Sequence, residues 1–462
     1  MALVQLRNVT GCLVCGTARI KSLKTFMPTR NILALLATLL LIIAARFYLV
    51  ETYAIALPFW DQWDAEGDYL LRPWIEGRLR IDELWHTHNE HRIFPTRLLS
   101  LLIFNVTGVW DNVIEARVNI FLAACIPLII LLFLMRQREL HGVRWLILIV
   151  IIAQFALPFS FENMLVGFQS QFYFLMIFTL FALILAARYP DSLLAMAGIL
   201  VLSWLSVLTM ASGILTPLAA TGVYALQGFL KREVNWKHVG MVVVLVGLAA
   251  LGYSIMPHIE GNQIYRSRNI AEIRKALRFI LSWPVSKSWP AAIALWFPAV
   301  GMVCWLLRSR ALSRADMVMA GCAMWSLGQT LAIAYGRGQA MGGVSSRYTE
   351  LFTIGLIGNA WFAARFIEIT LKNKRVAWLG AVFFVVFIMG HTSRRKRDMR
   401  DVYHTYELSM KQETNVRKYM KTGDASVLVQ PLFQIPYPDS IRLRSLLDNP
   451  TIRPILPPYL SE

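Results

Sequence analysis

The stretch VNIFLAACIPLIILLFLM, residues 118–135, decides the fold class of this chain. It carries no charged side chain, and as an α-helix it would be about 27 Å long, close to the roughly 30 Å of a membrane's hydrocarbon core. Its apolar residues are continuous and do not alternate with polar ones, which excludes a strand of a transmembrane β-barrel. The stretch therefore predicts a membrane-spanning helix.

The whole chain repeats this pattern. Hydrophobic residues make up 56% of its 462 residues and charged residues only 16%, which excludes a soluble globular protein. We therefore expect an all-α polytopic membrane protein with about eleven transmembrane helices. The net charge of +18 is typical of basic loops that contact anionic lipid, so we expect membrane lipid and no nucleic acid as a partner. The predicted helices cover residues 31–50, 115–135, 144–160, 171–188, 193–209, 213–230, 239–256, 290–307, 316–335, 350–371 and 376–391.

Basic residues predict the orientation, because loops rich in Lys and Arg stay in the cytoplasm. Such residues occur in every second short loop and in the N-terminal tail, residues 1–30, whereas residues 159–170 and 209–213 contain none. The outer, periplasmic side then holds a first loop at 51–114, loops at 257–289 and 336–350, and the tail 392–462. The run Arg394 to Arg397 opposes this placement of the tail. Because residues 403–462 of the tail are rich in proline, we expect them to lie over the outer face as irregular chain with short helices.

The first outer loop carries most of the acidic and histidine residues. It opens with FWDQWD, residues 59–64, and continues to HNEHRI, residues 88–93. Apolar residues at helical spacing follow each motif, in 69–75 and 94–102, and predict short helices that lie in the membrane interface. The loop would therefore hold its acids just above the bilayer.

These features resemble the GT-C class of glycosyltransferases. The motifs FWDQWD, HNEHRI, ENMLVGFQ (162–169) and the stretch from GRG (336–338) to SSRY (345–348) are similar to those of bacterial envelope proteins of this class, including serotype-converting O-antigen glucosyltransferases. The resemblance implies a transferase in the bacterial inner membrane with a periplasmic active site. Its donor would be a polyprenyl-phosphate-linked sugar, and its acceptor a glycan or lipid-linked oligosaccharide.

A carboxylate is needed to take the proton of the acceptor hydroxyl. Asp61 follows the first helix closely and stands between Trp60 and Trp63, so we predict Asp61 as the general base with Asp64 as its partner. Which of the two acids is the base stays open, and a helix cap or a solvated acid is the alternative. The two indoles are candidates to stack on a sugar.

Arginines on the same side would stabilise the departing phosphate. Arg337 and Arg347 flank a glycine-rich loop, and we predict that both bind the donor phosphate, with Tyr348 and Arg92 as further ligands. The alternative is that the arginines only reach toward lipid headgroups.

Further polar residues are candidates for sugar binding, with loop packing as the alternative for the group at 162–171. His86, His88, Glu90 and His91 match no helical zinc motif, so no metal site is assigned, although a divalent cation shared with Asp61 or Asp64 stays open. The competing functions are a transporter or flippase and a scaffold without activity. The predicted sugar ligands are Glu162, Gln169, Gln171, Glu90, His91, Trp60 and Trp63.

Overall fold

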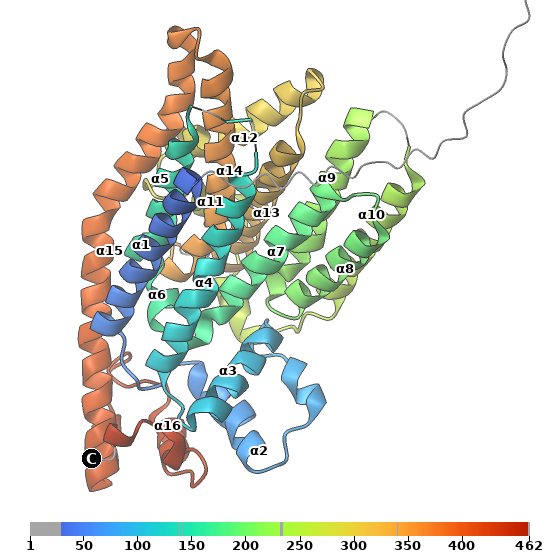
Figure 1. Ribbon diagram of the computed structural model, residues 1–462. Coiled ribbons are helices and arrows are strands. Elements are labelled where there is room, and N and C mark those ends of the chain that lie inside the picture. Colours follow the sequence, from blue (N-terminus) through green and yellow to red (C-terminus); the bar gives the residue numbers. More distant parts are fainter. Residues whose placement is uncertain (1–28, 138, 141, 232–233, 340, 461–462) are drawn as a thin grey trace, which may run out of the picture.

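The computed structural model describes residues 29–137, 139–140, 142–231, 234–339 and 341–460 (Figure 1). The N-terminal tail prediction therefore lies almost wholly outside the described residues. The described part is helical, and its only strand-like feature is an isolated bridge between His88 and His91. Within the described residues, ten helical segments are long and apolar enough to cross a membrane, which confirms a polytopic membrane protein.

Each predicted segment coincides with a helix, and the eleventh, α8 (Leu193–Val207), is a shorter apolar helix. The others are α1 (Thr29–Tyr53), α4 (Asn112–Leu134), α5 (Arg144–Ala156) continued by the short α6 (Phe161–Leu165), α7 (Ser170–Arg188), α9 (Leu215–Lys231), α10 (Trp236–Ser254), α12 (Trp289–Arg308), α13 (Arg314–Arg337), α14 (Ser346–Thr370) and α15 (Lys374–Thr422).

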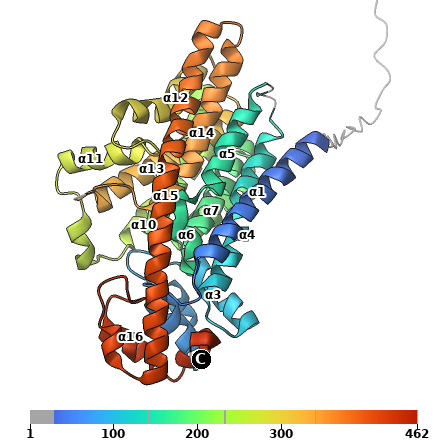
Figure 2. The ribbon, with the colours of Figure 1, turned by 90° about the vertical axis from the view of Figure 1, so that its left-hand side faces the viewer.

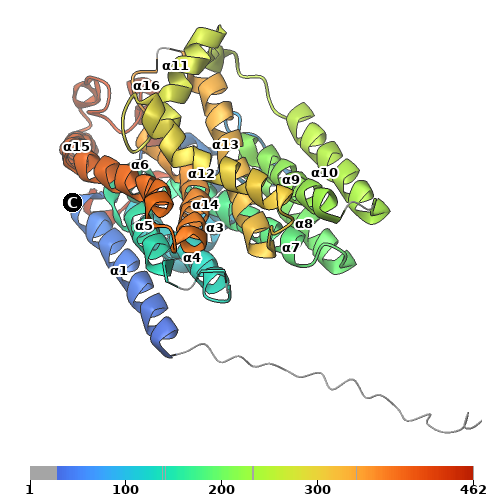
Figure 3. The same ribbon diagram turned by 90° about the horizontal axis from the view of Figure 1, so that it is seen from above.

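Helices α13 and α14 form the centre of the bundle. Seen from above, α1, α5 and α15 lie on one side of them and α8, α9 and α10 on the other (Figure 3). A Cβ atom at Gly358 would lie 2.6 Å from the carbonyl oxygen of Met319, so glycine is needed for this close approach of the two helices. Ser326 on α13 donates its hydroxyl to the carbonyl of Leu351 on α14 at 2.9 Å, which sets the register of the antiparallel pair.

One end of the bundle carries a globular extension, which we call the loop end. It contains α2 (Arg72–Ile75), α3 (Phe94–Thr107) and α16 (Ser440–Leu447), and α15 extends from the bundle into it (Figures 1 and 2). The first loop and the C-terminal tail share one hydrophobic cluster there, in which Trp63 and Trp110 pack with Leu443 and Leu447. The loop and the tail are therefore packed into one unit.

The expectation of irregular chain over residues 403–462 is wrong for residues 403–422, the first third of this segment. Helix α15 does not end near residue 391 but continues to Thr422, and the chain turns at Gly423, whose φ is +69°. All of the tail's prolines come after that turn, so nothing interrupts the helix before it. Val416 and Tyr419 are buried in the hydrophobic cluster that the first loop and the tail share, which stabilises the extension of the helix.

Helix α11 (Ile270–Leu281) comes between α10 and α12 along the chain, and it packs against α13. Asn269 caps the start of this helix, because its side chain accepts from the backbone N–H of Glu272 at 3.0 Å. The loop before α11, and not α11 itself, forms one wall of the site described next.

Candidate functional site

A cavity of about 600 Å³ opens at the loop end of the bundle. Its walls come from the first loop, the start of α7, the loop before α9, the loop after α10, and the facing ends of α13 and α14. It brings together eight of the residues predicted from the sequence: Asp61, Glu90, His91, Gln169, Gln171, Arg337, Arg347 and Tyr348.

Asp61 lies at the cavity wall on a sharply turned segment. The preceding Trp60 has φ of +53°, in the left-handed region that a bulky residue rarely adopts. The tail holds this turn in two ways. The backbone N–H of Trp60 donates to the carbonyl of Pro436 at 2.7 Å, and the indole of Trp60 stacks on Phe433 with ring centroids 5.1 Å apart. The Asp61 side chain remains 42% exposed, and its carboxylate lies 3.7 Å from Nε2 of His88. A substrate in the cavity can therefore reach it.

Asp64 has a different environment and does not line the cavity. Its carboxylate pairs with Arg442 of α16 at 2.9 Å and accepts from the hydroxyl of Tyr437 at 2.5 Å. Burial and this hydrogen bond raise the pKa of Tyr437. Arg442 also pairs with Asp68. Asp64 therefore joins the first loop to the tail.

The two tryptophans beside Asp61 do not line the cavity. Trp63 is completely buried, and its indole N–H donates to the carbonyl of Pro58 at 2.9 Å. Trp60 is covered on one face by Phe433. Their positions thus do not support the predicted stacking of these indoles on a sugar. The turn at residue 60 directs Asp61 into the cavity, whereas the two neighbouring indoles pack against other protein groups.

Arg337 lines the cavity but is already paired. Its guanidinium lies 3.1 Å from the carboxylate of Glu90 and donates to the side-chain oxygen of Asn262, also at 3.1 Å. Asn262 in turn donates to Glu90 at 2.6 Å. This network closes the cavity wall between the first loop and the loop after α10, and it leaves Arg337 with a neutralised charge.

Arg347 stands at the start of α14, and among the described residues no carboxylate forms an ion pair with it. Its guanidinium carbon lies 5.3 Å from the centre of the Tyr348 ring, and both side chains line the cavity. Its backbone N–H donates to the carboxylate of Glu162 at 3.0 Å, and the hydroxyls of Ser345 and Ser346 donate to the same oxygen. Glu162 is thus a cap for α14 and does not line the cavity.

A buried ion pair supports the first turn of α14. Arg46 of α1 lies 2.9 Å from Glu350, with both side chains only 1% exposed, and it also donates to the hydroxyl of Tyr173. Ser160 donates to Glu350 at 3.0 Å. We did not single out Arg46 from the sequence. The available signal was a charged residue inside an apolar run, which in a membrane protein is costly unless it is paired.

Two further predicted residues are engaged by protein groups. Arg92 donates to the carbonyls of Trp85 and Ile255 at 2.9 and 2.8 Å and does not line the cavity, so it is not placed to bind a phosphate there. Nδ1 of His91 accepts from the backbone N–H of Ala211 at 3.2 Å. Burial lowers the pKa of His91 to about 4, so it is neutral at pH 7.

The amides of Gln169 and Gln171 line the cavity beside each other, with Gln171 donating to Gln169 at 3.0 Å. Among the described residues no three His, Cys, Asp or Glu side chains are grouped so that they could hold a metal ion. Cavity residues that we did not single out as site residues include Ser212, His258, Asn262 and Gln329. They are separated along the chain, and only the fold brings them to one place.

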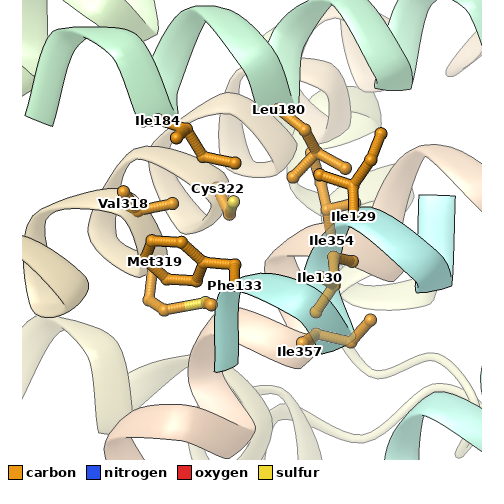
Figure 4. A pocket seen from close by; sticks show the side chains of 10 residues that line it. All are labelled: Ile129, Ile130, Phe133, Leu180, Ile184, Val318, Met319, Cys322, Ile354 and Ile357. Carbon is orange, nitrogen blue, oxygen red and sulfur yellow. The ribbon is translucent and has the colours of Figure 1, made fainter. Parts of the chain in front are cut away.

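A second, much smaller cavity lies inside the bundle between α4, α7, α13 and α14. It measures about 10 Å³, and its walls are Ile129, Ile130, Phe133, Leu180, Ile184, Val318, Met319, Cys322, Ile354 and Ile357 (Figure 4). No charged or amide side chain lines it.

Comparisons with family models, curated proteins and solved structures found no match to this chain.

Proposed function

We propose that the protein is a membrane glycosyltransferase of the bacterial inner membrane. It would move a sugar, such as glucose, from a polyprenyl-phosphate donor to a hydroxyl of O-antigen or another envelope glycan at the periplasmic face. The observation that carries the proposal is the combination of an accessible carboxylate, Asp61, and an arginine without a carboxylate partner, Arg347, in one cavity at the loop end of a membrane bundle.

Each reaction component has a counterpart in this cavity. Asp61 takes the proton of the acceptor hydroxyl while the oxygen of that hydroxyl bonds to the anomeric carbon of the sugar. The bond from that carbon to the phosphate oxygen breaks, and the electron pair leaves with the polyprenyl phosphate. Arg347 stabilises the charge that develops on this phosphate, because a guanidinium binds phosphate oxygens in a fork.

The geometry refines the expected roles of the arginines and acids. We assign the phosphate to Arg347 before Arg337, because Glu90 already neutralises Arg337. We assign the base to Asp61 before Asp64, because Asp64 is paired with Arg442. A divalent cation is not part of the proposal.

The competing proposal is a transporter or flippase for a lipid-linked sugar. Such a protein needs a polar path through the middle of the bundle. The cavity there measures only about 10 Å³ and is lined by apolar side chains and Cys322, whereas the cavity of about 600 Å³ with polar side chains opens at the loop end. This contrast favours an enzyme with its site at the loop end.

The test is transfer of radiolabelled glucose from undecaprenyl phosphate to a lipid-linked glycan by the purified protein in liposomes. Asp61→Asn keeps the size of the side chain and abolishes its basicity, so we expect transfer to fall about 10² to 10⁴-fold with donor binding nearly unchanged. Asp64→Asn is the control and should mainly lower stability. The proposal fails if Asp61→Asn keeps wild-type transfer, or if wild-type protein moves the lipid across the bilayer without forming a glycosidic bond.

A further inference from the structure

Gln329 is a fully buried amide on α13 that lines the large cavity. Within the described residues, neither its side-chain oxygen nor its side-chain nitrogen meets a hydrogen-bond partner. Nearly all buried polar groups in proteins are hydrogen-bonded, because a group left unpaired loses its bonds to water and gains none in return. An amide whose two polar atoms are both unpaired therefore indicates a ligand that enters the cavity.

Ser212 is a second group of this kind. It lies in the short 3₁₀ turn Ala211–Ile214 before α9, its buried hydroxyl has no partner among the described residues, and it lines the same cavity. A Cβ atom at Gly328, the neighbour of Gln329, would lie 2.9 Å from Leu215, the residue that follows this turn. The two unpaired groups are therefore at the same end of the cavity.

This end of the cavity is level with Arg347. Ser326 of α13 bonds to Leu351 of the antiparallel α14. Gln329 lies three residues beyond Ser326 toward the loop end, and Tyr348 lies three residues from Leu351 in the same direction. Each step is a rise of about 4.5 Å along its helix. A ligand that contacts Gln329 can thus have its phosphate at Arg347.

The surroundings of the two groups select the chemical class of the ligand. Ile214, Ile333 and Leu351 line the cavity with them. A lipid chain would leave the amide unpaired, and a phosphate would require a cation beside it. A sugar ring suits both the apolar side chains and the amide. Its C–H groups pack on apolar side chains, and its hydroxyls both donate and accept hydrogen bonds, as the amide does.

We propose that Gln329, together with Ser212, binds hydroxyls of the sugar carried by the donor and determines which sugar is accepted. This inference rests on the proposed function, because it takes the donor to be a lipid-phosphate sugar. A site built to bond a hydroxyl discriminates strongly against ligands that lack it, because its own buried polar groups are then left unpaired.

The test compares two probes, undecaprenyl phosphate and undecaprenyl phosphate glucose, by their dissociation constants for the purified protein in nanodiscs. Wild-type protein should bind the glucose-bearing probe about tenfold more tightly, a preference expected for one or two buried hydrogen bonds. Gln329→Leu and Ser212→Ala should lose most of this preference while they bind undecaprenyl phosphate as the wild type does. Gln329→Met, which has nearly the same length, should behave like Gln329→Leu.

Ser203→Ala is the matched control. The Ser203 hydroxyl is also buried without a partner among the described residues, but it belongs to α8 and does not line the cavity, so this variant should keep the full preference. The thermal stability of Gln329→Leu without ligand should equal or exceed that of the wild type, because the substitution removes an unpaired amide.

Three results would overturn the inference. The first is a wild-type protein that binds both probes equally, and the second is a Gln329→Leu variant that keeps the preference. The third is equal loss of affinity for both probes in Gln329→Leu, which would indicate a structural role. Because these are binding measurements, they are independent of whether a glycosidic bond forms, and failure of the proposed function would be seen separately as absent transfer.

Discussion

At the scale of single residues, Asp61 and Asp64 show how strongly the surroundings decide what a side chain can do. The two acids are three residues apart in one motif, yet Asp61 faces the cavity while Asp64 pairs with Arg442 and Tyr437. Arg337 and Arg347 differ in the same way, because among the described residues only the guanidinium of Arg337 forms an ion pair with a carboxylate. A paired charge is a poor ligand for a substrate, since binding must first break the pair.

The first prediction separates a forked phosphate contact from a simple positive charge. If Arg347 binds the phosphate by two parallel hydrogen bonds, Arg347→Lys should lose nearly as much transfer activity as Arg347→Ala, because lysine keeps the charge and loses the fork. Arg92→Lys is the control and should keep activity, because Arg92 does not line the cavity and donates to backbone carbonyls. Recovery of most activity in Arg347→Lys would instead indicate a charge effect or a lipid contact.

The second prediction concerns pH. The pKa of His91 is lowered to about 4 in the folded protein, against an ordinary value near 6.5 in the unfolded chain. Between these values the unfolded state binds more protons, so the stabilising contribution of neutral His91 is complete above about pH 6.5 and is lost as pH falls toward 4. Melting temperatures measured from pH 7.5 to 4.5 should fall less steeply for His91→Gln than for the wild type. Parallel curves would contradict this assignment.

At the scale of elements, the C-terminal tail is part of the candidate site. Helix α15 carries the chain to the loop end, and the segment after it holds the turn of Trp60 through Phe433 and Pro436. Arg442 of α16 adds ion pairs to Asp64 and Asp68. The tail therefore supports the strained turn that presents Asp61 to the cavity.

The third prediction follows from this contact. Arg442→Ala leaves Asp64 and Asp68 without their shared partner in a partly buried site. We therefore expect the free energy with which the tail packs on the first loop to weaken by about 1–3 kcal/mol. Limited proteolysis should cut within residues 423–460 faster, and transfer should fall, while the membrane bundle stays intact. Arg444→Ala is the matched control, because Arg444 lies on the same helix, is 56% exposed and, within the described part of the chain, forms an ion pair only with exposed Asp448. Equal cleavage of the two variants would show that the ion pairs do not hold the tail.

At the scale of the whole molecule, the residues of the cavity come from segments that are far apart along the chain but share one end of the bundle. Because successive crossings alternate in direction, the ends of α1, α10 and α13 and the starts of α7, α9 and α14 meet at that end. Lys and Arg in the alternate loops predict that this end is the periplasmic one.

The fourth prediction tests this orientation. The native cysteines are first replaced, and single cysteines are then introduced at Arg78 or Gly261 of the loop end, or at Asn373 of the opposite end. All three sites are exposed. A membrane-impermeant maleimide should label the first two in intact spheroplasts and Asn373 only after permeabilisation. Labelling of Asn373 alone in intact cells would reverse the orientation and place the cavity in the cytoplasm.

Much of the architecture follows from composition alone. Apolar runs long enough to cross a membrane must form helices there, because only a helix satisfies its own backbone hydrogen bonds in lipid, and the ten long helices of the bundle lie where such runs are found. The motif at 59–64 and the arginine at 347 likewise mark where polar side chains collect. The extension of α15 was missed, because hydropathy records where the membrane ends and not where a helix ends.

The sequence by itself thus determined the class of protein, its helices and the segments that carry polar chemistry, because those depend on local composition. The tertiary structure decided which of the polar residues face a common cavity. It pairs Arg337 with Glu90 and Asp64 with Arg442, buries Trp63, and leaves Asp61, Arg347 and the amide of Gln329 facing the same space. These outcomes depend on contacts between residues far apart in the chain, and local composition does not encode such contacts.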